Sequence, residues 1–234
     1  MYSSTLEAPV LLVGAAHVID LAAPLRATFS GRTLDAVALE LDEERAATLL
    51  APEGSTPSRR VGAPVFVRLW AIMQRRLGEE MGGGIAGAEM RVAAEVARER
   101  RLPVFFIDDP LRETLGRLLA SLSFRERVSL LLGGVIGLFL PARAVEHQLE
   151  QYSNSPSDYL GELRSAYPNV ARVLLDERNE HMADRLGELR RRGFGRMAAV
   201  VGDAHVLGLA DALRRRGIPA ETVPFAQLRA VTGP

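Results

Sequence analysis

Two histidines close the same short pattern, one near each end of the chain. The pattern reads Val-Gly-Ala-Ala-His-Val over residues 13–18 and Val-Gly-Asp-Ala-His-Val over residues 201–206. An apolar run leads into each copy, which predicts a buried strand, and a glycine just past a strand lets the backbone turn sharply. In a parallel sheet both turns lie at the carboxyl edge, where α/β proteins place their sites. We therefore expect His17 and His205 to meet there. The alternative is a worn duplication that keeps two core or surface histidines.

A carboxylate is expected at the same edge. Glu40 ends the second predicted strand, residues 35–40, and the residues just before it are apolar. Two imidazoles and one carboxylate suit a divalent metal ion and leave coordination positions open for water. Such an ion would lower the pKa of a bound water and polarise a carbonyl. The alternative is that Glu40 caps the helix that follows.

Other acidic residues and a third histidine occupy positions that suit a site. Asp108 ends the third predicted strand, residues 103–108, and Asp109 follows it. They are candidates to support a metal ligand or to add one, and they are equally suited to cap the next helix. Glu177 and His181 are one helical turn apart, which suits a pair of ligands as well as an ordinary ion pair.

Two arginines lie beside carboxylates in predicted helices. Arg91 follows Glu89 at the start of one helix, and Arg178 lies between Glu177 and Asn179 in a later one. An arginine at a site can hold a substrate carboxylate with two hydrogen bonds or stabilise an oxyanion. Both arginines are therefore candidates for contact with a substrate.

Composition excludes several classes of protein. The 234 residues include 29 basic and 29 acidic side chains, so the whole chain has no electrostatic footprint for DNA or RNA. The absence of cysteine removes disulfides, thiolate nucleophiles and cysteine-based zinc sites. No signal-peptide pattern is visible at the start, and we expect a cytoplasmic protein. The longest apolar stretch, residues 128–140, contains three glycines and is too short to span a bilayer. It is either core or a subunit interface, which favours a homodimer.

The elements that must position these residues follow from the hydrophobic pattern. We expect one α/β domain over residues 1–234, with a mainly parallel sheet that carries the two Gly-x-x-His motifs at strand ends. The α/β segments cover about residues 8–110 and 195–234, and a mainly helical insertion covers about residues 111–194. The last two strands are predicted at residues 197–201 and 220–223, and the glycine-rich stretch 82–87 is a mobile or tightly turned segment.

Helix ends carry local signals. Ser123 with Glu126 fits a capping box, in which each residue bonds the backbone of the other. Arginine runs end the helices before Gly193 and Gly217, where the cations complement the helix dipole and the glycines suit a C-cap. A nucleic-acid patch is the alternative interpretation of these runs, and the neutral chain disfavours it.

Several segments occur together in an order that is typical of one family. They are the two Gly-x-x-His motifs and residues 37–45, 74–80, 87–91, 120–124 and 175–179. From about Leu11 to about Ala212 the chain resembles the TraB/PrgY pheromone-shutdown family, which includes the Tiki proteins. Each segment alone is weak, but the combination is specific. That family is similar in fold to erythromycin esterase and to the haem-binding ChaN proteins, which implies an α/β core with helical additions.

The resemblance also implies roles for particular residues. Tiki members are regarded as metal-dependent proteases that use two Gly-x-x-His motifs with a glutamate and an arginine. By resemblance these roles fall to His17, Glu40, Arg91 and His205. The residues implied as their support are Glu89, Glu177, Arg178 and Asn179. The first motif departs from the family pattern, because Ala15 replaces a threonine and removes a hydroxyl.

Taken together, these residues predict a metal-dependent hydrolase of the peptidase type. His17, His205 and Glu40 would hold a divalent ion such as manganese, cobalt or zinc, and Arg91 or Arg178 would steady the substrate carbonyl or carboxylate. Two other functions use the same pocket. One is a non-enzymatic protein that sequesters a peptide or another small ligand, and the other is a metal-free esterase.

Overall fold

The strands form one parallel sheet. The computed structural model describes residues 8–15, 22–51, 88–137 and 156–230, so His17 and the glycine-rich stretch 82–87 lie outside the described residues. Five strands pair in the order β3-β2-β4-β1-β5. They are β1 (Val10–Ala15), β2 (Ala36–Leu39), β3 (Val104–Phe106), β4 (Met197–Gly202) and β5 (Ala220–Val223). Every pairing is parallel, which confirms the α/β class and the parallel sheet.

The two strands that lead into the Gly-x-x-His motifs are neighbours. β1 pairs with β4, with Gly14 opposite Val201 and Ala15 opposite Gly202. Both strands therefore end at the same edge of the sheet, and the two motif glycines are offset by one position in the register. The meeting of His17 with His205 stays a prediction.

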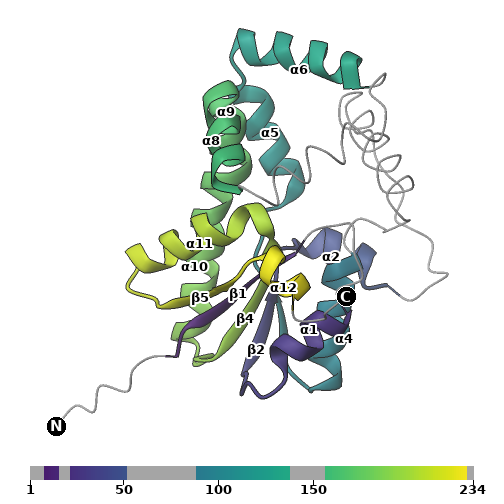
Figure 1. Ribbon diagram of the computed structural model, residues 1–234, viewed down its shortest axis with the longest axis vertical. Helices are drawn as coiled ribbons and strands as arrows, with labels where there is room; N and C mark the ends of the chain where they lie inside the picture. Colours follow the sequence, from purple (N-terminus) through teal and green to yellow (C-terminus); the bar gives the residue numbers. More distant parts are fainter. Residues whose placement is uncertain (1–7, 16–21, 52–87, 138–155, 231–234) are drawn as a thin grey trace.

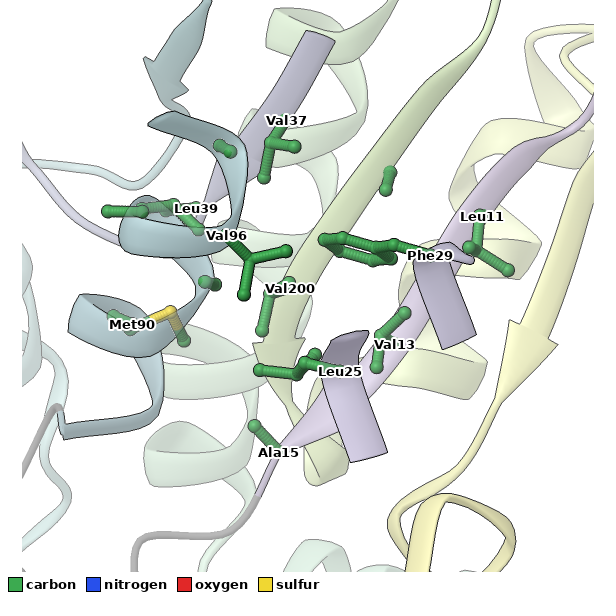
Figure 2. Close-up of a cluster of buried hydrophobic side chains, with 14 of the residues drawn as sticks. Leu11, Val13, Ala15, Leu25, Phe29, Val37, Leu39, Met90, Val96 and Val200 are labelled. Atoms are coloured by element: carbon green, nitrogen blue, oxygen red, sulfur yellow. The ribbon is translucent and has the colours of Figure 1, made fainter. Parts of the chain in front are cut away.

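Side chains alternate between two buried faces along each central strand. Figure 2 shows Leu11 and Val13 of β1 on one face, where they pack with Leu25 and Phe29 of α1 (Ala22–Phe29). α4 (Ala88–Glu99; Figure 2) and α12 (Phe225–Ala230; Figure 1) cover the same face. The intervening strand residues pack on the opposite face against α10 (Glu177–Arg191) and α11 (Asp203–Arg215). Strands covered on both faces are apolar throughout, which is why these runs could be identified from the sequence.

The described chain between β3 and β4 is helical. Its elements are α5 (Leu111–Ser121), α6 (Phe124–Gly137), α8 (Pro156–Ala166), α9 (Pro168–Ala171), a π-helix over Arg172–Asp176, and α10. Pro168 begins α9, where its missing N–H costs no hydrogen bond. In Figure 1, α5, α6, α8 and α9 stand beyond the carboxyl ends of the strands. None of the described helices is both long enough and apolar enough to cross a membrane.

Glu126 ties two of these helices together. Its carboxylate accepts bonds from Ser123 N and Oγ at 2.9 and 2.8 Å, which confirms the capping box. It also accepts bonds from Asn169 N and Nδ2, both at 2.8 Å, which no local pattern predicted. Burial acts to raise the pKa of Glu126, but the bonds from Asn169 and Ser123 outweigh burial and lower this pKa to about 2.

The arginine runs end helices, as predicted. Arg190 and Arg191 lie in the last turn of α10, and Arg214 and Arg215 lie in the last turn of α11. Gly193 and Gly217 follow with φ values of 102° and 71°, a conformation that glycine adopts without a Cβ penalty.

Candidate functional site

Glu40 and His205 meet at the carboxyl edge of the sheet. Glu40 directly follows β2, and Gly202 ends β4, the strand beside it. His205 lies in the first turn of α11, so its ring returns over the edge. His205 Nε2 lies 3.4 Å from Glu40 Oε1, and the two residues are only 4% and 8% exposed. The turn after β4 therefore brings the histidine of the second motif onto the carboxylate.

Arg178 of α10 links the carboxylates to the histidine. Its Nη2 donates to Glu40 Oε1 and, at 2.8 Å, to Asp108 Oδ2, while its Nε donates to Asp108 Oδ1 at 2.9 Å. Its Nη1 contacts His205 Nε2 at 3.0 Å and donates to the Leu174 carbonyl at 3.2 Å. A guanidinium has five N–H donors, and these five contacts use all of them. Arg178 therefore holds protein groups in place in this structure, and its contact with a substrate stays a prediction.

Asn179 holds the other side of the His205 ring. His205 Nδ1 and Asn179 Oδ1 are 2.8 Å apart, and both side chains are buried. We call Glu40, Asp108, Arg178, Asn179 and His205 the edge cluster. Its members come from the ends of β2 and β3 and from the starts of α10 and α11.

Neither Glu40 nor Asp108 caps a helix. Asp42 is the N-cap of α2 (Glu43–Leu49) and accepts a bond from Arg45 N at 2.8 Å. Asp42 also accepts a bond from Leu111 N at 3.2 Å, so it serves the first turn of α5 as well. The other oxygen of Glu40, Oε2, accepts from Gly202 N at 2.6 Å. The capping alternatives for Glu40 and Asp108 are therefore not what the structure shows.

The surroundings keep Glu40 ionised and His205 neutral. Burial acts to raise the pKa of Glu40, but the charge of Arg178 and the hydrogen bonds from Arg178 and the Gly202 N–H lower it. Burial lowers the pKa of His205, and the nearby carboxylate of Glu40 opposes this only in part. Burial also acts to lower the pKa of Arg178, but the carboxylates of Glu40 and Asp108 raise it. The cluster thus presents a carboxylate and an imidazole lone pair beside a permanent cation.

This chain has relatives among known proteins. The sequence profile of the TraB/PrgY/gumN family matches residues 4–222. The chain belongs to the TraB/PrgY/gumN family. It is also 26% identical over 223 residues to an uncharacterized protein of Methanocaldococcus jannaschii, an alignment that covers 92% of this chain and 56% of that protein. The chain therefore spans little more than half the length of this relative.

The edge cluster gathers three of the segments that carry the resemblance to the TraB/PrgY/gumN family. Glu40 comes from residues 37–45, Arg178 and Asn179 from residues 175–179, and His205 from the second Gly-x-x-His motif. These segments are far apart in the chain and are brought together by β2, α10 and β4. The resemblance in separate stretches of sequence thus corresponds to one place in the fold.

Other predicted site residues of this family member have different partners. Arg91 Nη2 donates to the Leu49 carbonyl at the end of α2, at 2.6 Å. The catalytic role predicted for Arg91 stays a prediction. Glu89 is buried in the first turn of α4. His17 belongs to the residues that the structure does not describe.

Glu177 and His181 do not pair with each other. Glu177 forms ion pairs with Arg117 and Arg172, and His181 Nδ1 lies 3.0 Å from Asp109 Oδ1. The predicted ion pair between Glu177 and His181 is therefore not what the structure shows, because their partners come from α5, the π-helix and the chain after β3.

Arg45 is a contact of the edge cluster that sequence reasoning missed. Its Nη1 donates to Asp108 Oδ2 at 3.0 Å, so the Asp108 carboxylate receives bonds from two arginines. Arg45 lies in the first turn of α2, where a cation is unfavourable for the helix dipole. This unfavourable position is the feature of the sequence that could have indicated a carboxylate partner for Arg45. The pairing with Asp108 offsets that cost.

Proposed function

We propose that this chain is a hydrolase of the peptidase type in which His205, Glu40 and His17 hold a divalent metal ion. The observation that supports it is the 3.4 Å separation of His205 Nε2 and Glu40 Oε1. Two ligand atoms on one tetrahedral zinc ion lie about 3.3 Å apart, given bond lengths of about 2.0 Å. The pair is therefore spaced as two ligands of a common ion.

The protonation state of each residue suits this role. Metal ions bind ionised carboxylates and neutral imidazoles, and the pKa shifts favour both forms. A histidine that binds metal through one nitrogen usually donates a hydrogen bond from the other, and Asn179 Oδ1 accepts such a bond from His205 Nδ1. When bound, a divalent ion would supply an activated water and polarise the scissile carbonyl.

Arg178 sets a condition on this proposal. Its Nη1 and Nη2 contact the same two atoms, His205 Nε2 and Glu40 Oε1, that an ion would need. Two ligands are also too few, and among the described residues no group of three or more acidic or histidine side chains is placed to hold an ion. Metal binding therefore requires Arg178 to release these two atoms and to keep its hydrogen bonds to Asp108. It also requires a further ligand, and His17 is the predicted one.

A metal-free esterase is the second candidate, and the contacts of Arg178 favour it. The guanidinium already balances the charge of Glu40 and donates a hydrogen bond to His205, so Glu40 and His205 do not need a metal ion to balance their charge. In this case the neutral imidazole of His205 would accept the proton from an attacking water, and the Glu40 carboxylate would stabilise the imidazolium that forms. A binding protein without catalysis would use the same groups to hold a peptide or another small ligand.

Metal content and affinity of the purified protein separate these functions. Wild type would be compared with His17→Ala, His205→Ala and Glu40→Gln by elemental analysis and by calorimetry with manganese, cobalt and zinc. His181→Ala is the matched control, because His181 pairs with Asp109 rather than with the edge cluster. One ion per chain, retained in the control and lost in the other three variants, is the expected result and would justify a peptide-cleavage screen. If wild type binds none of the three metals, the metal-dependent function is wrong.

Two further expectations stay proposals. A cytoplasmic location rests on the sequence pattern alone. A homodimer would need an exposed apolar surface, and at the start of α6 Phe124 is 81% exposed and Val128 is 39% exposed. Sedimentation of wild type beside Phe124→Ser would test the dimer.

A further inference from the structure

His205 is held through both ring nitrogens, and this defines its tautomer. Arg178 Nη1 lies 3.0 Å from His205 Nε2, and a guanidinium can only donate hydrogen bonds. Nε2 must therefore carry the lone pair, and the proton of the neutral ring is on Nδ1. Asn179 Oδ1 accepts a hydrogen bond from this Nδ1–H, with 2.8 Å between the nitrogen and the oxygen. The two contacts agree on one state, in which Nε2 accepts a hydrogen bond from Arg178 and lies 3.4 Å from Glu40 Oε1.

The Asn179 amide fits only because α11 carries a glycine beside it. Gly208 lies one turn after His205 on α11, and Asn179 lies on the packed helix α10. A Cβ on Gly208 would be 3.2 Å from Asn179 Cγ and well inside 3.0 Å of Asn179 Nδ2, closer than such atoms approach. Asn179 is only 4% exposed, so its amide cannot give way without leaving His205. Glycine is unfavourable within a helix, and at Gly208 the space that a Cβ would take is filled by the Asn179 amide.

We propose that Gly208 is a positioning residue, whose missing side chain admits the Asn179 amide that holds His205 as its Nδ1–H tautomer. The chain of contacts runs from Gly208 to Asn179 to His205 and ends at the nitrogen that faces Glu40. The importance of Gly208 for catalysis rests on the proposed function, in which His205 Nε2 binds the metal ion. The positioning itself depends only on the packing of α10 against α11.

Gly208→Ala in the full chain tests this, with Gly116→Ala as the matched control. Gly116 lies within α5, and a Cβ there would meet no atom within 4 Å. The readout is the pair of imidazole ¹⁵N shifts of His205, assigned with His205→Gln. Wild type and Gly116→Ala should show a protonated Nδ1 and an unprotonated Nε2. Gly208→Ala should show averaged or exchanged shifts, because a ring that Asn179 no longer holds can rotate and lose its contact with Arg178 Nη1 as well.

Asn179→Ala, alone and combined with Gly208→Ala, separates positioning from packing. Asn179→Ala should disturb the His205 shifts as much as Gly208→Ala does, although it adds no atoms. The double variant should regain the melting temperature that Gly208→Ala loses, because the clash is gone, but it should not regain the tautomer. This also gives a folded protein for measurement if Gly208→Ala does not fold.

An unchanged Nδ1–H tautomer in Gly208→Ala or in Asn179→Ala would overturn the positioning role. The outcome does not depend on metal binding or hydrolysis, because the shifts are read without either. A protein that binds no metal but responds as expected would reject the proposed function and keep this inference. If the Gly208→Ala variant binds metal through His205 and keeps the Nδ1–H tautomer, the proposed function stands and this inference is wrong.

Discussion

The carboxylate of Glu40 and the guanidinium of Arg178, which are 138 residues apart in the chain, form a largely buried ion pair. A buried pair loses more hydration than its own attraction returns unless further hydrogen bonds complete it. Here Asp108 holds Arg178 with two bonds, and Gly202 N donates to the free oxygen of Glu40. The edge cluster is therefore a network in which each charge depends on the others.

Asp108→Asn should destabilise the protein strongly. The amide would lose the negative charge that faces Arg178 and Arg45 and would turn an N–H₂ group toward one of these cations. We expect the free energy of unfolding to fall by about 3–5 kcal/mol, the cost of breaking a buried pair. Chemical denaturation of the variant and of wild type measures this difference.

Asp176→Asn is the control for that measurement. Asp176 also accepts two bonds from one arginine, Arg164, but both side chains are more than two-fifths exposed. An exposed pair contributes only about 0–1 kcal/mol, so this variant should remain close to wild type. Equal losses in the free energy of unfolding for Asp108→Asn and Asp176→Asn would show that burial does not determine how much the ion pairs of the edge cluster stabilise the protein.

Glu126 should make the stability of the helical region sensitive to acid. Its folded pKa is about 2, below the ordinary value of 4.5, so the carboxylate stabilises the folded state above pH 4.5. That contribution is lost as the pH falls from 4.5 toward 2, when the unfolded chain takes up the proton first. Glu126→Gln should cost about 1–3 kcal/mol at pH 7, because Asn169 and Ser123 keep donors that the amide cannot all accept.

Thermal denaturation between pH 2 and pH 7 checks this dependence on Glu126. The wild-type melting temperature should fall more steeply below pH 4.5 than that of Glu126→Gln. Glu162→Gln, which changes an exposed residue of α8, should follow wild type. Parallel curves for wild type and Glu126→Gln would contradict the prediction.

The two motif glycines should differ in their tolerance of a side chain. A Cβ on Gly14 would meet the Asp203 carboxylate well inside contact distance and Phe225 N at 3.0 Å. A Cβ on Gly202 would lie 3.3 Å from Glu40 Oε2, a contact that a small shift relieves. Gly14→Ala should therefore cost about 1–3 kcal/mol, as overpacking of a core does, and Gly202→Ala should cost less.

Melting temperatures of the two alanine variants rank them directly. Circular dichroism of each variant before heating shows whether the comparison is between folded proteins. A larger loss for Gly202→Ala than for Gly14→Ala would mean that the approach of β1 to Asp203 is looser than the structure shows.

Local signals in the sequence determined the elements of this protein. The apolar runs of β1, β2 and β4 could be identified because strands buried on both faces are continuous in hydrophobicity. Ser123 and Glu126 were identified as a capping box because both partners lie within one helical turn. The carboxyl-edge position of Glu40 followed from parallel pairing, which the α/β pattern predicts.

Only the tertiary structure decided which side chains meet. Nothing near Arg178 in the sequence indicates that its five donors go to Asp108, Glu40, His205 and Leu174 rather than to a substrate. Nor does any short-range pattern give the contact of Asn179 with Gly208, which depends on how α10 packs against α11. Periodicity reports the burial of one element at a time, whereas hydrogen-bond partners depend on the packing of distant elements, and that packing is decided by the whole fold.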